Sequence, residues 1–161
     1  MERRQKYPNT KTFRYFNANP KGRITADCSI RAISKATGLD YNDVVMGLAK
    51  VQCETGYEPT TGKGLEIYMD SIGWEKQSQP KKSSGKKYTG EEFCKYLNKN
   101  LDGWYGEGIV ANIGGHHMVA IMPTDNLDKQ ENWKVFDIWD STDGCIGNYW
   151  INKKSIHLSR K

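Results

Sequence analysis

The hydrophobic residues of this chain change their spacing part-way along it. Between residues 28 and 101 they recur every three or four positions, as in Ile30, Ile33 and Ala36, which is typical of amphipathic helices. From residue 108 onward, four short apolar runs separated by turn residues predict strands near 108–113, 117–122, 133–139 and 148–151. Helices followed by strands predict an α+β fold, in which N-terminal helices pack on a C-terminal antiparallel β-sheet.

The length of the chain fits one domain. Its 161 residues are enough to bury a hydrophobic core without metal or disulfide cross-links, so we expect a single domain over 1–161. Residues 1–23 are polar and basic with interspersed aromatic residues, and predict a docking arm followed by a loop. The remainder divides into a mainly helical half, 24–101, and a mainly β half, 102–161.

Composition excludes several classes of protein. The longest uninterrupted apolar run, 118–122, is far shorter than a membrane helix requires, and no apolar segment follows the basic N-terminus as in a secretory signal. A cytoplasmic protein without a membrane partner is therefore expected. The net charge of +5 is modest, and only six of the 24 basic residues are arginine, so nucleic acid is not an expected partner.

The four cysteines show neither zinc-site nor disulfide spacing, so we expect free thiols. Cys28 is distinguished from the others by its place at the start of a predicted helix. The unpaired N–H groups and positive dipole at a helix N-terminus stabilise a thiolate and make it nucleophilic at neutral pH. Asp27 opposes this effect, so a nearby cation is needed, for which Arg23 and Arg31 are the candidates. Cys53 and Cys94 are expected in the core.

A histidine and an aspartate follow in the order that a thiol nucleophile requires. His117 begins a predicted strand after two glycines and can serve as the base or ion-pair partner of Cys28. Asp137, on the next strand, can accept the Nδ1–H of the imidazole and fix its orientation. Asp140 is an alternative third member, because one bulged residue in this strand would exchange the two faces. His116 is expected to point away and to lie exposed or at the rim of the site.

These three windows resemble the papain-like cysteine peptidase superfamily. In that superfamily the nucleophilic cysteine begins the first long helix, a His-Ala-Val-Ala motif begins a strand, and Asn-Ser-Trp follows one strand later. Here His117-Met118-Val119-Ala120 is similar to the second motif and Asp137-Ile138-Trp139 to the third. The segments 27–33 and 137–141 also look like those of small papain-fold proteins of bacteria and bacteriophages. The resemblance implies a papain-like fold, with Cys28, His117 and Asp137 as the catalytic residues and Trp139 shielding the Asp–His hydrogen bond.

One expected feature of that superfamily is missing. Its members stabilise the oxyanion with a Gln about six residues before the cysteine, where this chain has Gly22. Asn19, Asn17 or Thr25 could supply the donor beside the backbone N–H of Cys28, and Asn19 is preferred because its Asn-Pro turn could direct the amide inward.

The sequence therefore predicts a papain-like cysteine hydrolase that cleaves an amide, isopeptide or related acyl bond in a peptide, protein or similar substrate. Acyl transfer to an amine would use the same residues. The alternatives are a catalytically inactive papain-fold binding or inhibitor protein, favoured by the missing Gln, and a basic nucleic-acid-binding protein. No cofactor or metal is expected, because His116 and His117 are adjacent and would face opposite sides of a strand, which disfavours zinc ligation with Cys28 and Asp137.

Overall fold

A computed structural model describes residues 1–100, 108–124 and 132–154 of the chain. The expected boundary between the two halves, at 101 and 102, lies outside the described residues. The elements in chain order are α1 (Arg3–Lys6), β1 (Phe13–Tyr15), α2 (Cys28–Thr37), α3 (Tyr41–Thr55), α4 (Gly62–Ser71), β2 (Trp74–Gln77), α5 (Gly90–Asn100), β3 (Ile109–Ile113), β4 (His117–Pro123), β5 (Trp133–Asp137) and β6 (Ile146–Asn152).

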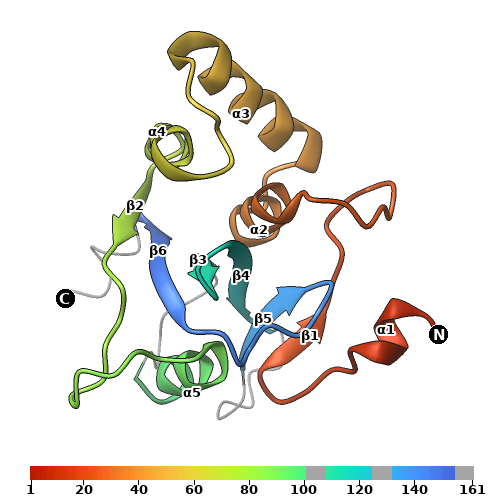
Figure 1. Ribbon diagram of the computed structural model, residues 1–161, viewed down its shortest axis with the longest axis vertical. Helices are drawn as coiled ribbons and strands as arrows, with labels where there is room; N and C mark the ends of the chain where they lie inside the picture. The colour runs from red at the N-terminus through yellow and green to blue at the C-terminus, as the bar shows by residue number, and fades with distance from the viewer. Residues whose placement is uncertain (101–107, 125–131, 155–161) are drawn as a thin grey trace.

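The strands form one six-stranded sheet in the order β1-β5-β4-β3-β6-β2 (Figure 1). Four neighbouring pairs are antiparallel, but β1 runs parallel to β5, so the sheet is mixed. The expectation of a purely antiparallel sheet from the C-terminal half is wrong, because β1 and β2 come from the N-terminal part and occupy the two edges. A three-residue strand such as β1 is too short to show a periodic pattern. Its Phe13 is nevertheless fully buried, so the N-terminal arm docks partly as a strand.

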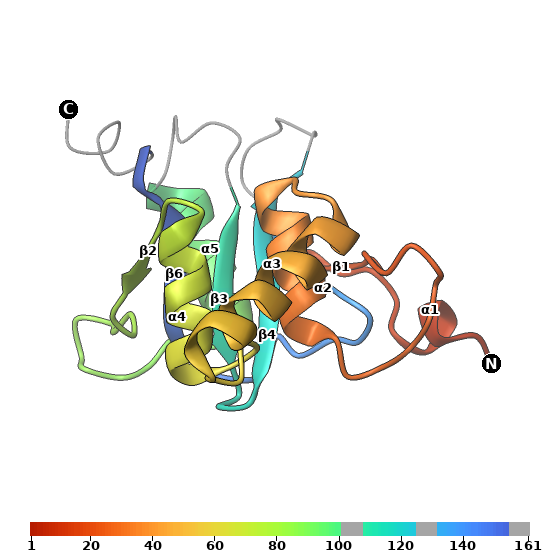
Figure 2. The same ribbon diagram turned by 90° about the horizontal axis from the view of Figure 1, so that it is seen from above.

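Helices cover both faces of the sheet, which makes the fold α+β in three layers (Figures 1 and 2). Helices α2, α3 and α4 lie on one face and share a core with Val110, Met118 and Ala120. Helix α5 lies on the opposite face, where it packs with the alternate residues of the same strands, such as Ile109 and Val119. The sequence predicts helices that pack on the sheet but does not assign them to its faces. Strands β3 and β4 are apolar on both faces, so each face needs a covering layer.

Helix α2 lies against β4, in the middle of the sheet. It begins at Cys28, as expected, and ends at Gly38, whose φ of 77° allows its N–H to bond the Ser34 carbonyl. Its buried residues Ala32, Ile33 and Ala36 face the sheet. The first turn of α2 therefore lies at the end of the sheet where β4 begins and β5 ends.

Local signals place the neighbouring helices as expected. Asp40 caps α3 by accepting the backbone N–H groups of Asn42 and Asp43, and Thr89 caps α5 through the N–H of Glu92. Within the described ranges, none of the helices has the length and apolar character needed to span a membrane.

Candidate active site

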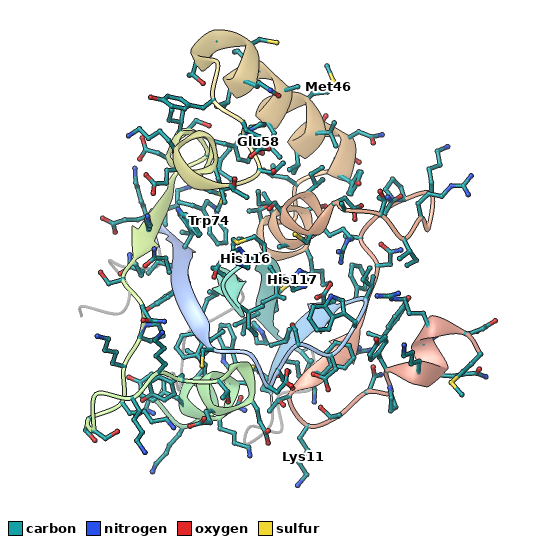
Figure 3. The ribbon with its side chains drawn as sticks, in the orientation of Figure 1. Lys11, Met46, Glu58, Trp74, His116 and His117 are labelled. Atoms are coloured by element: carbon teal, nitrogen blue, oxygen red, sulfur yellow. The ribbon has the colours of Figure 1, made fainter. Side chains whose placement is uncertain are left out.

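Three elements bring Cys28, His117 and Asp137 together. Cys28 is the first residue of α2, His117 the first of β4 and Asp137 the last of β5. A turn with Gly114 and Gly115 at φ of 62° and 86° precedes His117, and these backbone conformations favour glycine. Figure 3 shows His116 and His117 at the end of β4 beside α2.

The imidazole of His117 joins the other two side chains. Its Nε2 forms a hydrogen bond with Oδ2 of Asp137, and the Cys28 thiol lies close enough to the ring for each group to shift the pKa of the other. The expected contact between Asp137 and Nδ1 of His117 is therefore wrong. Because Nε2 is taken by Asp137, Nδ1 is the nitrogen left for the thiol. Which nitrogen faces which partner depends on the approach of two strands, which the sequence does not contain.

The two candidate aspartates have different partners. Asp137 lies at the end of a regular strand and is buried, with its Oδ1 also accepting the backbone N–H of Ile138 at 2.7 Å. Asp140 follows the strand and accepts the backbone N–H and the hydroxyl of Thr142, at 3.0 and 2.6 Å. No bulge in β5 exchanges their faces in the described residues, so Asp137 and not Asp140 contacts His117.

The cation beside Asp27 is Arg31, one of the two candidates from the sequence. Its Nε donates to Oδ1 of Asp27 at 2.7 Å, and its Nη1 donates to Oδ1 of Asp137 at 2.6 Å. All three side chains are buried. The other candidate, Arg23, lies exposed on the loop before α2.

The surroundings shift the pKa values of the thiol and the imidazole in opposite directions. Burial by itself raises the pKa of Cys28, but hydrogen bonds from the His117 ring and the Met118 backbone, together with nearby positive charge, lower it below its usual value. Burial lowers the pKa of His117, but its hydrogen bonds to Asp137 and Cys28 raise it to about 9. The two shifts favour a thiolate–imidazolium pair at neutral pH.

Asn19 is engaged elsewhere in the structure. Its side-chain amide donates to Oδ2 of Asp27 at 3.0 Å and to the Tyr41 hydroxyl at 3.3 Å. Both amide protons therefore have acceptors, which leaves none for an oxyanion. Of the other two candidates, Asn17 donates to the Arg23 carbonyl, and Thr25 is exposed.

A cavity of about 620 Å³ opens beside Cys28. Its apolar wall comes from Ile30, Leu65, Met118 and Trp150. His116 also lines it and is exposed, as expected for a residue at the rim.

Three amide side chains with no role expected from the sequence line the same cavity, namely Gln79, Asn112 and Asn148. Asn112 has one signal that could have drawn attention to it, because it is the polar residue in an otherwise apolar strand. Gln79 and Asn148 carry no such signal, since they reach the cavity only through the pairing of β2 and β6 with the sheet.

Trp139 lies over the histidine. Its ring centroid is 4.9 Å from that of His117, and the two planes are inclined by 41°. The indole therefore packs against the imidazole.

The site has the parts needed for nucleophilic chemistry by a thiol, namely a nucleophile, a base that contacts it and a carboxylate that orients the base. Among the described residues, no group of three or more His, Cys, Asp or Glu side chains is placed to hold a metal ion. Comparison of the chain with models of protein families, with curated proteins and with solved structures found no match.

Proposed function

We propose that the protein is a papain-like cysteine hydrolase that cleaves an amide, isopeptide or related acyl bond. The observation that carries the proposal is the chain of contacts from Cys28 through His117 to Asp137. A helix N-terminus, a strand start and a strand end from distant parts of the sequence supply the three residues. A packing role for Cys28 would not require a histidine and a buried carboxylate aligned behind it.

The reaction follows from the roles of these groups. His117 takes the proton of Cys28, and the thiolate attacks the acyl carbon, so that a C–S bond forms and the carbonyl electrons move to oxygen. The imidazolium then gives its proton to the leaving amine as the C–N bond breaks, which leaves a thioester on Cys28. Water, deprotonated by His117, attacks the thioester and releases the acid and the thiol. An amine in place of water would complete an acyl transfer.

Donors for the oxyanion and for the substrate are close to the nucleophile. The backbone N–H of Cys28 belongs to the first turn of α2, where N–H groups have no acceptor within the helix. The amides of Gln79, Asn112 and Asn148 line the adjoining cavity and offer further polar groups to a substrate. The side-chain N–H of Gln79 donates to the Ile146 carbonyl and that of Asn112 to the Gly115 carbonyl. A cavity lined by both amide and apolar side chains suits a peptide or protein segment as the substrate.

The position of the nucleophile's helix against the sheet supports the papain-like assignment. Helix α2 carries Cys28 at its start and packs on β4, whose first residue is His117, while Asp137 follows on the adjacent strand β5. All four cysteines of the chain are free, and Cys53 and Cys145 are exposed. Exposed free thiols are typical of a reducing compartment, so the proposal places the protein in the cytoplasm.

The test is the formation of an acyl-enzyme on Cys28. The protein is mixed with p-nitrophenyl acetate, and release of nitrophenol is followed while peptide mass spectrometry locates the acetyl group. We expect a burst of about one equivalent, with one acetyl group on Cys28, in the manner of covalent catalysis. Cys28→Ala is expected to abolish the burst, whereas Cys53→Ser and Cys145→Ser, which change exposed thiols, retain it.

A second measurement addresses amide bonds. Wild type and Cys28→Ala are incubated with a mixed peptide library, and new termini are identified by mass spectrometry. Cleavage that requires Cys28 supports the hydrolase. Equal acetylation of the three thiols that are not fully buried contradicts amide hydrolysis and favours the binding protein. If the wild type forms the acyl-enzyme but leaves the library uncut, amide hydrolysis is also contradicted, and the transferase is favoured.

A further inference from the structure

A buried arginine connects both carboxylates at the site. Arg31 lies on α2, one turn after Asp27 and on the same helix as Cys28, and its side chain is only 6 % exposed. Its Nε binds Asp27 and its Nη1 binds Asp137, with N–O distances of 2.7 and 2.6 Å. One guanidinium therefore links the residue before the nucleophile to the residue behind the histidine.

The link through Arg31 affects the orientation of the Asp137 carboxylate. Oδ1 accepts from Arg31 and from the Ile138 backbone N–H, while Oδ2 contacts His117. With two donors on one oxygen, the carboxylate has its rotation fixed and presents the other oxygen to the imidazole. The backbone N–H alone would leave Oδ1 with a single neutral donor.

The link through Arg31 also affects the charge next to Cys28, because it includes the carboxylate of Asp27. This carboxylate belongs to the residue next to Cys28 and would oppose a thiolate there. Arg31 offsets that charge from within the same helix turn. The guanidinium is itself held in place, because Oδ2 of Asp27 accepts from the Tyr41 hydroxyl at 2.6 Å and from Asn19 at 3.0 Å.

We propose that Arg31 is a positioning residue of this site, which fixes the Asp137 carboxylate against His117 and offsets the charge of Asp27 beside Cys28. The inference rests on the proposed function for its catalytic meaning. Both of its physical effects can be measured without any substrate.

Two variants separate orientation from charge. Arg31→Gln removes the charge and the fork, whereas Arg31→Lys keeps a positive charge that cannot bind two carboxylates in the same planar geometry. The charge-matched control is Arg23→Gln, because Arg23 is exposed and lies on the loop before α2. Far-UV circular dichroism and the urea midpoint establish which variants fold.

The first readout is the rate at which iodoacetamide alkylates Cys28, measured against pH. In Arg31→Gln we expect the thiolate pKa to rise and the rate at pH 7 to fall about tenfold, as for the loss of one nearby charge. Arg31→Lys is expected to stay within about threefold of wild type, since it retains a cation. The second readout is the low-field proton resonance of the His117–Asp137 hydrogen bond in NMR spectra. We expect both Arg31 variants, but not Arg23→Gln, to lose or shift this resonance.

The outcomes decide the inference separately from the function. A folded Arg31→Gln protein with the wild-type alkylation profile and resonance overturns the positioning role, even if the acyl-enzyme forms on Cys28. If Arg31→Gln does not fold, the resonance in Arg31→Lys decides alone, and an unchanged resonance overturns the role. If the wild type forms no acyl-enzyme but the Arg31 variants lose the resonance, the proposed function is refuted. The role of Arg31 in positioning Asp137 against His117 then still stands.

Discussion

Two cysteines on opposite faces of the sheet differ in their burial, their contacts and their thiol pKa values. Cys28 begins α2, is half-buried, and contacts the ring of His117. Cys94 lies within α5 on the other face, fully buried among Phe93, Leu97 and Val135. The pKa of Cys28 lies below its usual value, whereas burial raises that of Cys94 to about 12.

The difference between the two pKa values arises from the groups that surround each thiol. Burial disfavours both thiolates, but at Cys28 the imidazole, the Met118 backbone and Arg31 outweigh it. At Cys94 burial outweighs the Lys134 charge and the Val135 backbone N–H, both of which lower the pKa. The carbonyl of Thr12, 4.0 Å from the sulfur, can only accept a hydrogen bond from the neutral thiol. The pKa of Cys28 is lowered because hydrogen-bonding and charged groups outweigh burial there, whereas burial dominates at the core residue Cys94.

The largest expected effect is in the relative reactivity of these two thiols. At pH 7, iodoacetamide should modify Cys28 at least roughly a thousandfold faster than Cys94, because the thiolate fraction of Cys94 is minute and its sulfur is enclosed. Peptide mass spectrometry over time measures both rates in one sample. Comparable rates in the folded protein would remove the distinction between the two faces.

Removing the histidine should bring Cys28 closer to Cys94 in behaviour. His117→Ala deletes the hydrogen bond and the positive charge that lower the Cys28 pKa, so we expect alkylation at pH 7 to slow by about tenfold to a hundredfold. The matched control is His116→Ala, which changes an exposed neighbour on the rim of the cavity. Equal slowing in both variants would show that the effect is not specific to the contact.

The core cysteine should matter for stability instead. Cys94→Ser places a hydroxyl in an apolar cluster and is expected to lower the free energy of unfolding by about 1–3 kcal/mol. Cys145→Ser, at an exposed turn, is expected to change it by less than about 0.5 kcal/mol. Urea denaturation measures both. A Cys94→Ser protein as stable as Cys145→Ser would mean that the α5 face tolerates polar atoms.

The smallest effect concerns pH and stability. The His117 pKa is about 9 in the folded protein against 6.5 for the free side chain, so its contribution to stability is complete below pH 6.5 and is lost as the pH rises to about 9. The Cys28 pKa is shifted downward, so its contribution is complete above the ordinary thiol pKa of 9.0 and is lost as the pH falls. Where the two pH windows overlap, the two slopes oppose each other, so this pair should change the stability of the wild type less than either group alone would.

The variant Cys28→Ala isolates the contribution of His117 to the pH dependence of the free energy of unfolding. Without the thiol, the free energy of unfolding should decrease from pH 6.5 to 9, by about 1.4 kcal/mol for each unit by which the His117 pKa remains above 6.5. Urea midpoints across this range measure the slope, and the double variant Cys28→Ala/His117→Asn should lose it. Parallel curves for wild type and Cys28→Ala would contradict the coupling of the two groups.

Much of the fold follows from local signals. The change from helical to strand spacing, the cap at Asp40 and the glycine at 38 predicted helices and strands close to where they lie. The edge strand β1 and the position of α5 on the opposite face did not follow, because short strands carry no period and the covering of a sheet is decided by which of its faces are apolar. Cys53 was expected in the core and is exposed on α3, since its helix is buried along only one side.

The sequence by itself determined that a cysteine begins a helix, that a histidine begins a later strand and that an aspartate follows on the next. These are properties of residues close together in the chain, where capping and periodicity act. Only the tertiary structure decided that Nε2 of His117 meets Asp137, that Asp140 turns to Thr142 and that Arg31 joins two carboxylates. Those contacts depend on strand register and on the packing of α2 against β4, which short-range patterns do not contain.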